Sequence, residues 1–398
     1  MRNFNKNSVV FVVYILFIIS GTCSLSVVRP VMGSVFRSIT GQYSVDEAKN
    51  TINSALTDEL VYHDELVNLN GLKENILGNK VIRKEGSVIV KSDLESLIEV
   101  VGKLEEDEIN SVVKRIKELE MISESNGADF LYCAAPRKEL YEKAPGNVDN
   151  FSKYNYEMFL SALENSMIPY VDFSKELIKS DISVRDMFYY TDHHWKTNTG
   201  FVATGIICEM LHTKYDFNYN AQYTDVKNYE IKTYKDWFLG SRGKKVGKYF
   251  TWNGADDFEL IIPRFQTELI EEQPFKNQIR EGKFEDTVLY MENMEKDYYK
   301  INPYVTYSGG DFRLQIMKNK LNLNGSKILL IRDSFACVVS PFLALQTSEL
   351  HICDVRDDSH YVGDKLDMKE YIEQVQPDYV LVLYTGIGDV SDSRYDFF

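Results

Sequence analysis

The sequence predicts an α/β protein whose core is an open, doubly wound parallel sheet between helices. Two observations support this fold class: helical and strand-like segments alternate in two regions of the chain, and a stretch of different composition separates these regions. The chain has 398 residues, 44% of them hydrophobic, which is enough for a sizeable α/β domain with an insertion. Its formal net charge of −15 argues against a nucleic-acid partner.

The first alternating region lies between residues 92 and 172. Apolar side chains recur at spacings of three and four from Leu94 to Ile122, and Gly127 follows, which predicts one long helix. Short apolar runs on either side of a second helical segment predict two strands joined by a crossover. The expected elements are helices over 92–126 and 154–165, a strand over 130–135 and a strand around 170–172.

The second alternating region occupies the last part of the chain. Its expected elements are strands over 327–331, 350–355 and 379–384 and helices over 335–345 and 367–374. Between the two regions, a long apolar helix begins near Asn198. Residues 218–307 are then rich in Tyr, Phe and Thr and contain short runs of alternating polarity, which predicts a mostly β insertion.

The N-terminal segment predicts export. Arg2 and Lys6 precede an uncharged, largely apolar stretch over residues 8–28, which is typical of a signal peptide or of a single membrane-spanning helix. The positive flank places the rest of the chain outside the cytoplasm. We expect an uncleaved signal-anchor, which would hold the protein on the membrane at the cell surface. The alternative is a cleaved signal, which would give a secreted protein.

A serine stands where a predicted strand turns directly into a helix. In the segment 331–335, with the sequence Ile-Arg-Asp-Ser-Phe, Ser334 follows the strand and precedes the helix. This position lies at the carboxyl edge of the sheet, where α/β proteins bind their ligands, and beside the N–H groups of a helix start. It suits a nucleophile next to part of an oxyanion hole, although Asp333 and Ser334 before a helix also make an ordinary helix cap.

The segment 191–195, with the sequence Thr-Asp-His-His-Trp, offers the base that a serine hydroxyl needs. Asp192 and His194 are two residues apart, so in an extended turn both side chains project to the same side. A carboxylate that orients an imidazole beside a serine forms a catalytic triad. We therefore expect Ser334 Oγ within hydrogen-bond reach of His194, Asp192 on the far side of the ring, and Trp195 as a shield against water.

His193 is expected to be a bystander. A zinc site formed by Asp192, His193 and His194 is an alternative, but no further His or Cys cluster at ligand spacing accompanies these residues. We expect neither a metal nor another cofactor.

Together, the two segments resemble the bacterial DHHW proteins and, more distantly, the periplasmic alginate O-acetyltransferases with an SGNH-hydrolase-like domain. Residues 192–195 match the name-giving tetrapeptide, and the resemblance covers roughly residues 65–390. In the acetyltransferase relatives the motif reads Asp-x-His-Trp, which gives the triad roles to Asp192 and His194 and leaves His193 as the variable position. Relatives often have Gly where Arg332 stands.

The resemblance implies an SGNH-hydrolase-like, flavodoxin-like fold and covalent acyl transfer through Ser334. The implied acceptor is a cell-surface or exported polysaccharide, and a membrane-bound O-acyltransferase is the possible acyl donor. The expected organisation is a signal segment over 1–28, a stalk over 29–64 and an SGNH-like catalytic domain over 65–398 with its insertion at about 218–307. Further oxyanion or substrate contacts are expected from Gly240, Ser241, Lys138, Trp195 and Arg332. An esterase with the same triad and a non-catalytic cell-surface binding protein are the alternatives.

Overall fold

The fold was analysed in a computed structural model. It describes residues 62–398 except 85, 147, 358–360 and 388–392, together with residues 33, 34, 37, 44 and 47. The expected signal segment over 1–28 lies outside the described residues. In the described part of the chain, no helix is long and apolar enough to cross a membrane, so the expectation of a transmembrane signal-anchor is corrected.

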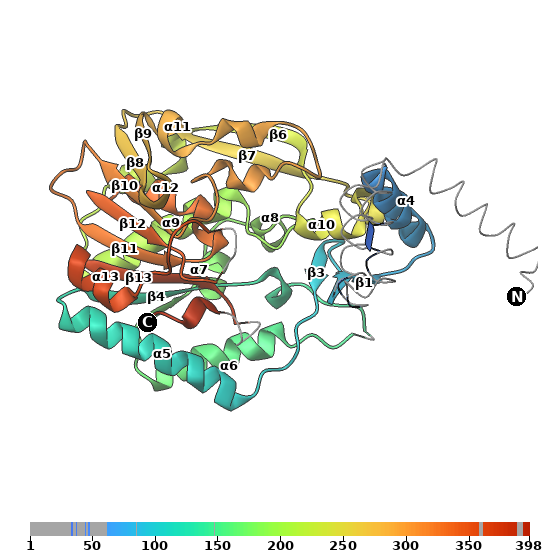
Figure 1. The fold of residues 1–398 in the computed structure, drawn as a ribbon, viewed down its shortest axis with the longest axis horizontal. Coiled ribbons are helices and arrows are strands. Elements are labelled where there is room, and N and C mark those ends of the chain that lie inside the picture. Colours follow the sequence, from blue (N-terminus) through green and yellow to red (C-terminus); the bar gives the residue numbers. More distant parts are fainter. Residues whose placement is uncertain are drawn as a thin grey trace, which may run out of the picture.

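A sheet of eight strands runs through the molecule in the order β5-β4-β13-β11-β12-β10-β8-β9 (Figure 1). The strands from β5 to β12 in this order are parallel, whereas β10, β8 and β9 are antiparallel to their neighbours. The strands are β4 (Asp129–Ala135), β5 (Tyr170–Asp172), β8 (Leu269–Gln273), β9 (Gln278–Gly282), β10 (Leu314–Asn319), β11 (Lys327–Arg332), β12 (Glu349–Cys353) and β13 (Tyr379–Thr385).

Helices cover both faces of this sheet. Alternate residues of the central strand β11 enter two separate cores: Leu329 and Ile331 pack on one face, and Ile328 and Leu330 on the other. Burial on both faces explains why this strand is an uninterrupted apolar run. One face carries α5 (Glu106–Ser125), α6 (Ser152–Asn165) and α13 (Met368–Val375), and the other carries α7 (Phe173–Lys179), α9 (Thr197–Tyr215) and α12 (Ser340–Ala344).

The chain between 218 and 307, where the sequence predicts a mostly β insertion, contributes strands to two different sheets. Its strands β6 (Tyr229–Phe238) and β7 (Asp256–Pro263) form an antiparallel pair of their own. Its other strands, β8 and β9, extend the edge of the main sheet beyond β10, and all three strands are antiparallel to their neighbours, so the sheet is mixed rather than parallel. Burial alternates along β8, which fits a strand that packs on one face only, whereas β9 at the edge of the sheet is largely exposed.

The predicted helix over 92–126 is wrong in its first half. Leu97 lies in β3 (Leu97–Glu99), which pairs with β2 (Ser87–Lys91), and β2 pairs with β1 (Val81–Lys84). The helix α5 begins only at Glu106, where the side chains of Glu105 and Glu108 form a capping box. Leu97 joins a small core with Val246 and Phe250, so tertiary packing overrides the helical spacing.

The predicted helix over 335–345 is also divided. A 3-10 helix, η8 (Ser334–Val338), comes first and α12 follows with Pro341 in its first turn. Proline lacks an N–H group and fits only the start of a helix, so its position enforces the break. The break leaves Ser334 at the end of β11 on a short, tight turn.

A smaller unit lies at the end of the molecule marked by α4 and α10 (Figure 1). It comprises α4 (His63–Ile76), the three-stranded sheet of β1, β2 and β3, α10 (Ser241–Val246) and the 3-10 helix η4 (Lys248–Phe250). Gly71 and Gly247 allow close backbone contact between α4 and the chain after α10, because a Cβ atom at either position would overlap a carbonyl oxygen.

Candidate active site

The structure brings Asp192, His194 and Ser334 into one hydrogen-bonded line. His194 Nε2 lies 2.7 Å from Ser334 Oγ, and His194 Nδ1 lies 2.5 Å from Asp192 Oδ1. The carboxylate therefore lies on the opposite side of the imidazole from the hydroxyl. Asp192 and His194 are almost fully buried, whereas Ser334 is half-buried. Residues separated by about 140 positions along the chain thus form one unit.

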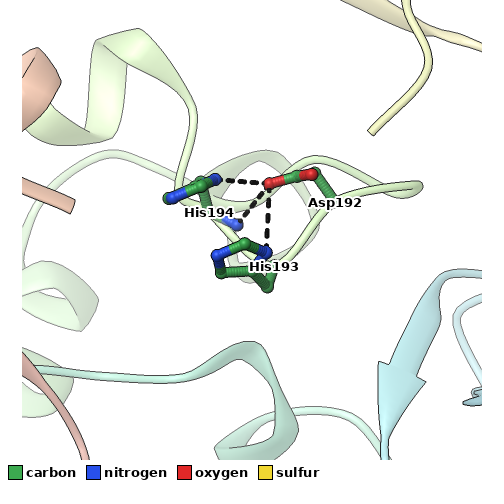
Figure 2. Close-up of side chains that lie close together, drawn as sticks. All are labelled: Asp192, His193 and His194. Carbon is green, nitrogen blue, oxygen red and sulfur yellow. Dashed lines mark hydrogen bonds and ion pairs between the residues drawn. The ribbon is translucent and has the colours of Figure 1, made fainter. Parts of the chain in front are cut away.

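A closed loop positions the acid and the base. The loop returns on itself because Phe188 and Trp195 form a β-bridge. Asp192 Oδ1 also accepts the backbone N–H of His194 at 3.0 Å, and its Oδ2 accepts the N–H of Ser241 at 2.6 Å. Figure 2 shows how the carboxylate faces both histidine rings. Both oxygens of Asp192 therefore accept hydrogen bonds that fix the orientation of the carboxylate.

The electrostatics favour an ionised Asp192. Burial alone would raise the pKa of its carboxyl group, but the imidazoles of His193 and His194 and the N–H of Ser241 outweigh burial. The result is a pKa well below the usual range for aspartate. A buried carboxylate that stays charged can stabilise an imidazolium on its neighbour.

The position of Ser334 depends on Asp333, which precedes it. Asp333 Oδ1 accepts the N–H of Phe335 at 3.0 Å, which caps η8. Its Oδ2 accepts the N–H of Thr385 at 2.8 Å and bonds Arg394 at 3.1 Å. Asp333 therefore ties the serine turn to the end of β13, in the capping role that its sequence position suggested.

Aromatic side chains fix the ring of His194. Tyr304 stacks on this imidazole with ring centroids 4.0 Å apart and an angle of 16° between the planes. Trp195 Nε1 donates to the carbonyl of Phe335 at 2.9 Å, and the Tyr304 hydroxyl donates to the same carbonyl at 3.3 Å. Sequence reasoning missed Tyr304, because it belongs to an aromatic-rich stretch in which no spacing distinguishes it.

Of the five residues expected to contact substrate, Gly240, Ser241 and Lys138 have backbone or side-chain donors that are already bonded within the protein, whereas the side chain of Ser241 is exposed. The Gly240 N–H donates to Thr191 Oγ1 at 2.8 Å, so neither it nor the Ser241 N–H is available to an oxyanion. Lys138 is fully buried and donates to the carbonyls of Tyr189 and Tyr190 at 2.9 and 3.1 Å. These contacts brace the loop that carries Asp192.

The remaining two expected contacts also point into the protein. Trp195 is fully buried against Phe335, and Arg332 is fully buried with its guanidinium bonded to Asp311 and to the Gly310 carbonyl. A buried guanidinium needs such partners because an unpaired buried charge is costly. Neither side chain is available to a substrate in this conformation.

His193 lies at the exposed side of the site. Its Nδ1 is 3.1 Å from Ser241 Oγ, and its ring centroid is 3.8 Å from that of His194. Its side chain is 40% exposed. One ligand atom each from Asp192, His193 and His194 lies within 4.8 Å of the others, so the same cluster could also hold a metal ion. The oxygens of Asp192 and the Nε2 of His194 are, however, engaged in the hydrogen bonds described above.

This protein has a mixed α/β fold with a large sheet of parallel and antiparallel strands. Several solved structures have a similar fold. PatB1 of Bacillus cereus has 18% identity and a TM-score of 0.63, over 78% of this chain and 100% of that one. A second structure of PatB1 carries a sulfonyl adduct, with 18% identity and a TM-score of 0.61 over 78% of this chain and 99% of that one.

A DHHW family protein of Eubacterium siraeum has 18% identity and a TM-score of 0.58, over 77% of this chain and 92% of that one. The O-acetyltransferase domain of Pseudomonas putida AlgJ has 11% identity and a TM-score of 0.44, over 76% of this chain and 94% of that one. No protein-family model and no curated protein matches the chain. The resemblance to the DHHW proteins that the motifs indicated is thus confirmed at the level of the fold.

Proposed function

We propose that this protein is an O-acyltransferase of the SGNH-hydrolase type. It transfers an acetyl or similar acyl group through Ser334 to a hydroxyl of a polysaccharide outside the cytoplasm. The observation that carries the proposal is the continuous hydrogen-bonded line from Asp192 through His194 to Ser334, with distances of 2.5 and 2.7 Å. The motif resemblance to the alginate O-acetyltransferases supports the transferase class, and the basic flank before residues 8–28 favours export.

The reaction proceeds in two halves through an acyl-enzyme. His194 Nε2 takes the Ser334 proton as Oγ attacks the ester carbonyl, and the same proton then passes to the leaving alcohol. In the second half, His194 takes the proton of the acceptor hydroxyl, whose oxygen attacks the acyl carbon. The bond to Oγ breaks and Ser334 regains a proton from His194.

The surroundings of His194 suit this sequence. Asp192 is ionised and stabilises the imidazolium that forms in each half. The stacked ring of Tyr304 presents its negative face to the same cation. The backbone N–H of Ser334 has no hydrogen-bond partner among the described residues, so it is available as a donor to the oxyanion.

Labelling tests whether Ser334 is the nucleophile. The full-length protein is treated with phenylmethylsulfonyl fluoride, and the modified residue is located by mass spectrometry. We expect one adduct on Ser334, as PatB1 also carries a sulfonyl adduct. Ser334→Ala should lose the adduct and the turnover of p-nitrophenyl acetate, and His194→Ala should lower turnover by roughly three to six orders of magnitude.

A metal alternative and a binding-protein alternative are tested in the same assay. Loss of turnover with EDTA and its return with Zn²⁺ would assign the cluster of Asp192, His193 and His194 to a metal instead. An unlabelled Ser334 together with no turnover would favour a binding protein.

Product analysis separates the transferase from an esterase. The protein receives p-nitrophenyl acetate with and without a panel of neutral and acidic oligosaccharides, and mass spectrometry follows acetylated sugar. A transferase must hold its acyl-enzyme for an acceptor, so we expect acetylated sugar and faster loss of donor when acceptor is present. Free acetate alone, whichever sugar is added, would make the protein an esterase.

A further inference from the structure

The first histidine of the motif, His193, lies beside the imidazole of His194. Figure 2 shows that His193 and His194 each turn one ring nitrogen toward Asp192 and the other away from it. For His194, the nitrogen that faces away is Nε2, which bonds Ser334 Oγ at 2.7 Å. His193 Nε2 likewise faces away from Asp192.

His193 is also held in a defined orientation. Its Nδ1 is 3.1 Å from Ser241 Oγ and 3.5 Å from Asp192 Oδ1, and its ring lies 3.8 Å from the ring of His194 at an angle of 36°. Ser241 is in turn fixed by its own N–H, which donates to Asp192. A side chain that is only packed against the surface would not need three such contacts.

The remaining nitrogen of His193 is available to a ligand. Its Nε2 has no hydrogen-bond partner among the residues that the structure describes, and the side chain is 40% exposed. By contrast, the side chain of His194 is only 8% exposed. The site thus presents two nitrogens side by side, one bonded to the nucleophile and one open to solvent.

We infer that His193 is an acceptor-specificity residue that binds the hydroxyl next to the one that becomes acylated. This inference rests on the proposed transferase function. The acceptor oxygen must reach the acyl carbon beside His194 Nε2, because His194 removes its proton. The two imidazole rings lie 3.8 Å apart, centre to centre, so hydroxyls on adjacent carbons of one sugar ring can each lie within hydrogen-bond reach of one imidazole. When the reacting hydroxyl contacts His194, the neighbouring hydroxyl meets His193 Nε2.

His193 exchanges no proton in this scheme. It forms one hydrogen bond to a bystander hydroxyl, while the proton of the reacting hydroxyl passes to His194 and then to Ser334 Oγ. The acceptor class that fits is a vicinal diol, as found on sugar rings, rather than an isolated alcohol. One neutral hydrogen bond of this kind corresponds to a preference of up to about tenfold.

A competition between two simple acceptors tests the inference. The acetyl-enzyme formed from p-nitrophenyl acetate is offered equal concentrations of cis-cyclohexane-1,2-diol and cyclohexanol, and the two acetate esters are quantified. Because both acceptors compete for one acyl-enzyme, their product ratio does not depend on the rate at which Ser334 is acylated. After correction for the two hydroxyls of the diol, we expect the wild-type protein to favour the diol about tenfold.

Three variants identify the residue responsible. His193→Ala should bring the corrected ratio close to one, and His193→Gln should retain part of the preference, since its carboxamide can still form a hydrogen bond. His63→Ala, which changes a histidine on α4, is the matched control and should keep the wild-type ratio. A wild-type ratio near one, or an unchanged ratio in His193→Ala, would overturn the inference while leaving the triad intact. If no ester forms from either alcohol although Ser334 is acetylated, the transferase proposal itself fails.

Discussion

At the scale of single residues, Gly240 shows how the site depends on close packing behind it. A Cβ atom at this position would lie 2.2 Å from the Cβ and 2.6 Å from the Cα of Asp192. The backbone angle of Gly240 is ordinary for any residue, so steric contact rather than conformation requires glycine here. Gly240 and Ser241 thus position the Asp192 carboxylate.

We predict that Gly240→Ala moves Asp192 away from His194 and lowers turnover of p-nitrophenyl acetate by on the order of 10²-fold, the effect expected for a misplaced catalytic group. The folded state should persist, as checked by circular dichroism. The matched control is Gly205→Ala on α9, where a Cβ would have only ordinary contact at 3.5 Å. Turnover of Gly240→Ala equal to that of the control would show that the Asp192 position tolerates displacement.

The hydrogen-bonded arrangement of Asp192, His194 and Ser334 could be predicted from the sequence because each of these residues carried its own local signal. Ser334 stood at a strand-to-helix junction, and Asp192 and His194 shared one motif. Tyr304 had no such signal, because its stacking on His194 arises only from the folded arrangement. Lys138 and Arg332 were expected to contact substrate but are bonded within the protein, because a sequence does not reveal whether a polar group already has a partner.

At the scale of elements, a buried ion pair connects the chain after β4 to α10. Arg242 Nη2 lies 2.6 Å from Glu139 Oε1, and both side chains are almost fully buried. Burial would raise the pKa of Glu139, but Arg242 and Arg137 outweigh it and lower the pKa to about 2. Arg242 also donates to the carbonyl of Leu97 at 2.9 Å, so the pair holds β3 as well.

This ion pair predicts an acid-sensitive contribution to stability. Because the folded-state pKa of Glu139 is below its unfolded value of about 4.3, the contribution is fully present above that value and is lost as the pH falls toward 2. Glu139→Gln should lower the free energy of unfolding by about 3 kcal/mol at pH 7 and by much less near pH 2. Urea denaturation at both pH values measures the difference, and a gap that stays constant would exclude the ion pair as its source.

The elements that the sequence predicted well are those with a strong local pattern. The central strands β4, β11 and β13 are continuous apolar runs, and the structure has them within a residue or two of the expected bounds. The segment around Leu97 had the spacing of a helix, yet it forms a strand because Val246 and Phe250 provide a partner surface. These two residues are more than 140 positions away from Leu97 along the chain, so the local spacing of apolar residues does not indicate them.

At the scale of the whole molecule, the smaller unit supports the active site through α10. Its helix α4 contacts the chain from α10 to η4, and α10 begins with Ser241, whose N–H holds Asp192. A Cβ atom at Gly71 would lie only 2.5 Å from the carbonyl oxygen of Val246 at the end of α10. A displacement of α4 should therefore shift α10 and its first residue, Ser241, and so change the position of the Asp192 carboxylate.

We predict that Gly71→Ala lowers both stability and activity. The overlap with a backbone oxygen should cost about 1–3 kcal/mol, which corresponds to a fall of several degrees in Tm for a chain of this size. Turnover of p-nitrophenyl acetate, measured well below Tm, should fall as the Ser241 bond to Asp192 loosens. Gly102→Ala is the matched control, because a Cβ there meets nothing within 4 Å. A lower Tm with unchanged turnover would mean that α4 stabilises the fold without positioning the triad.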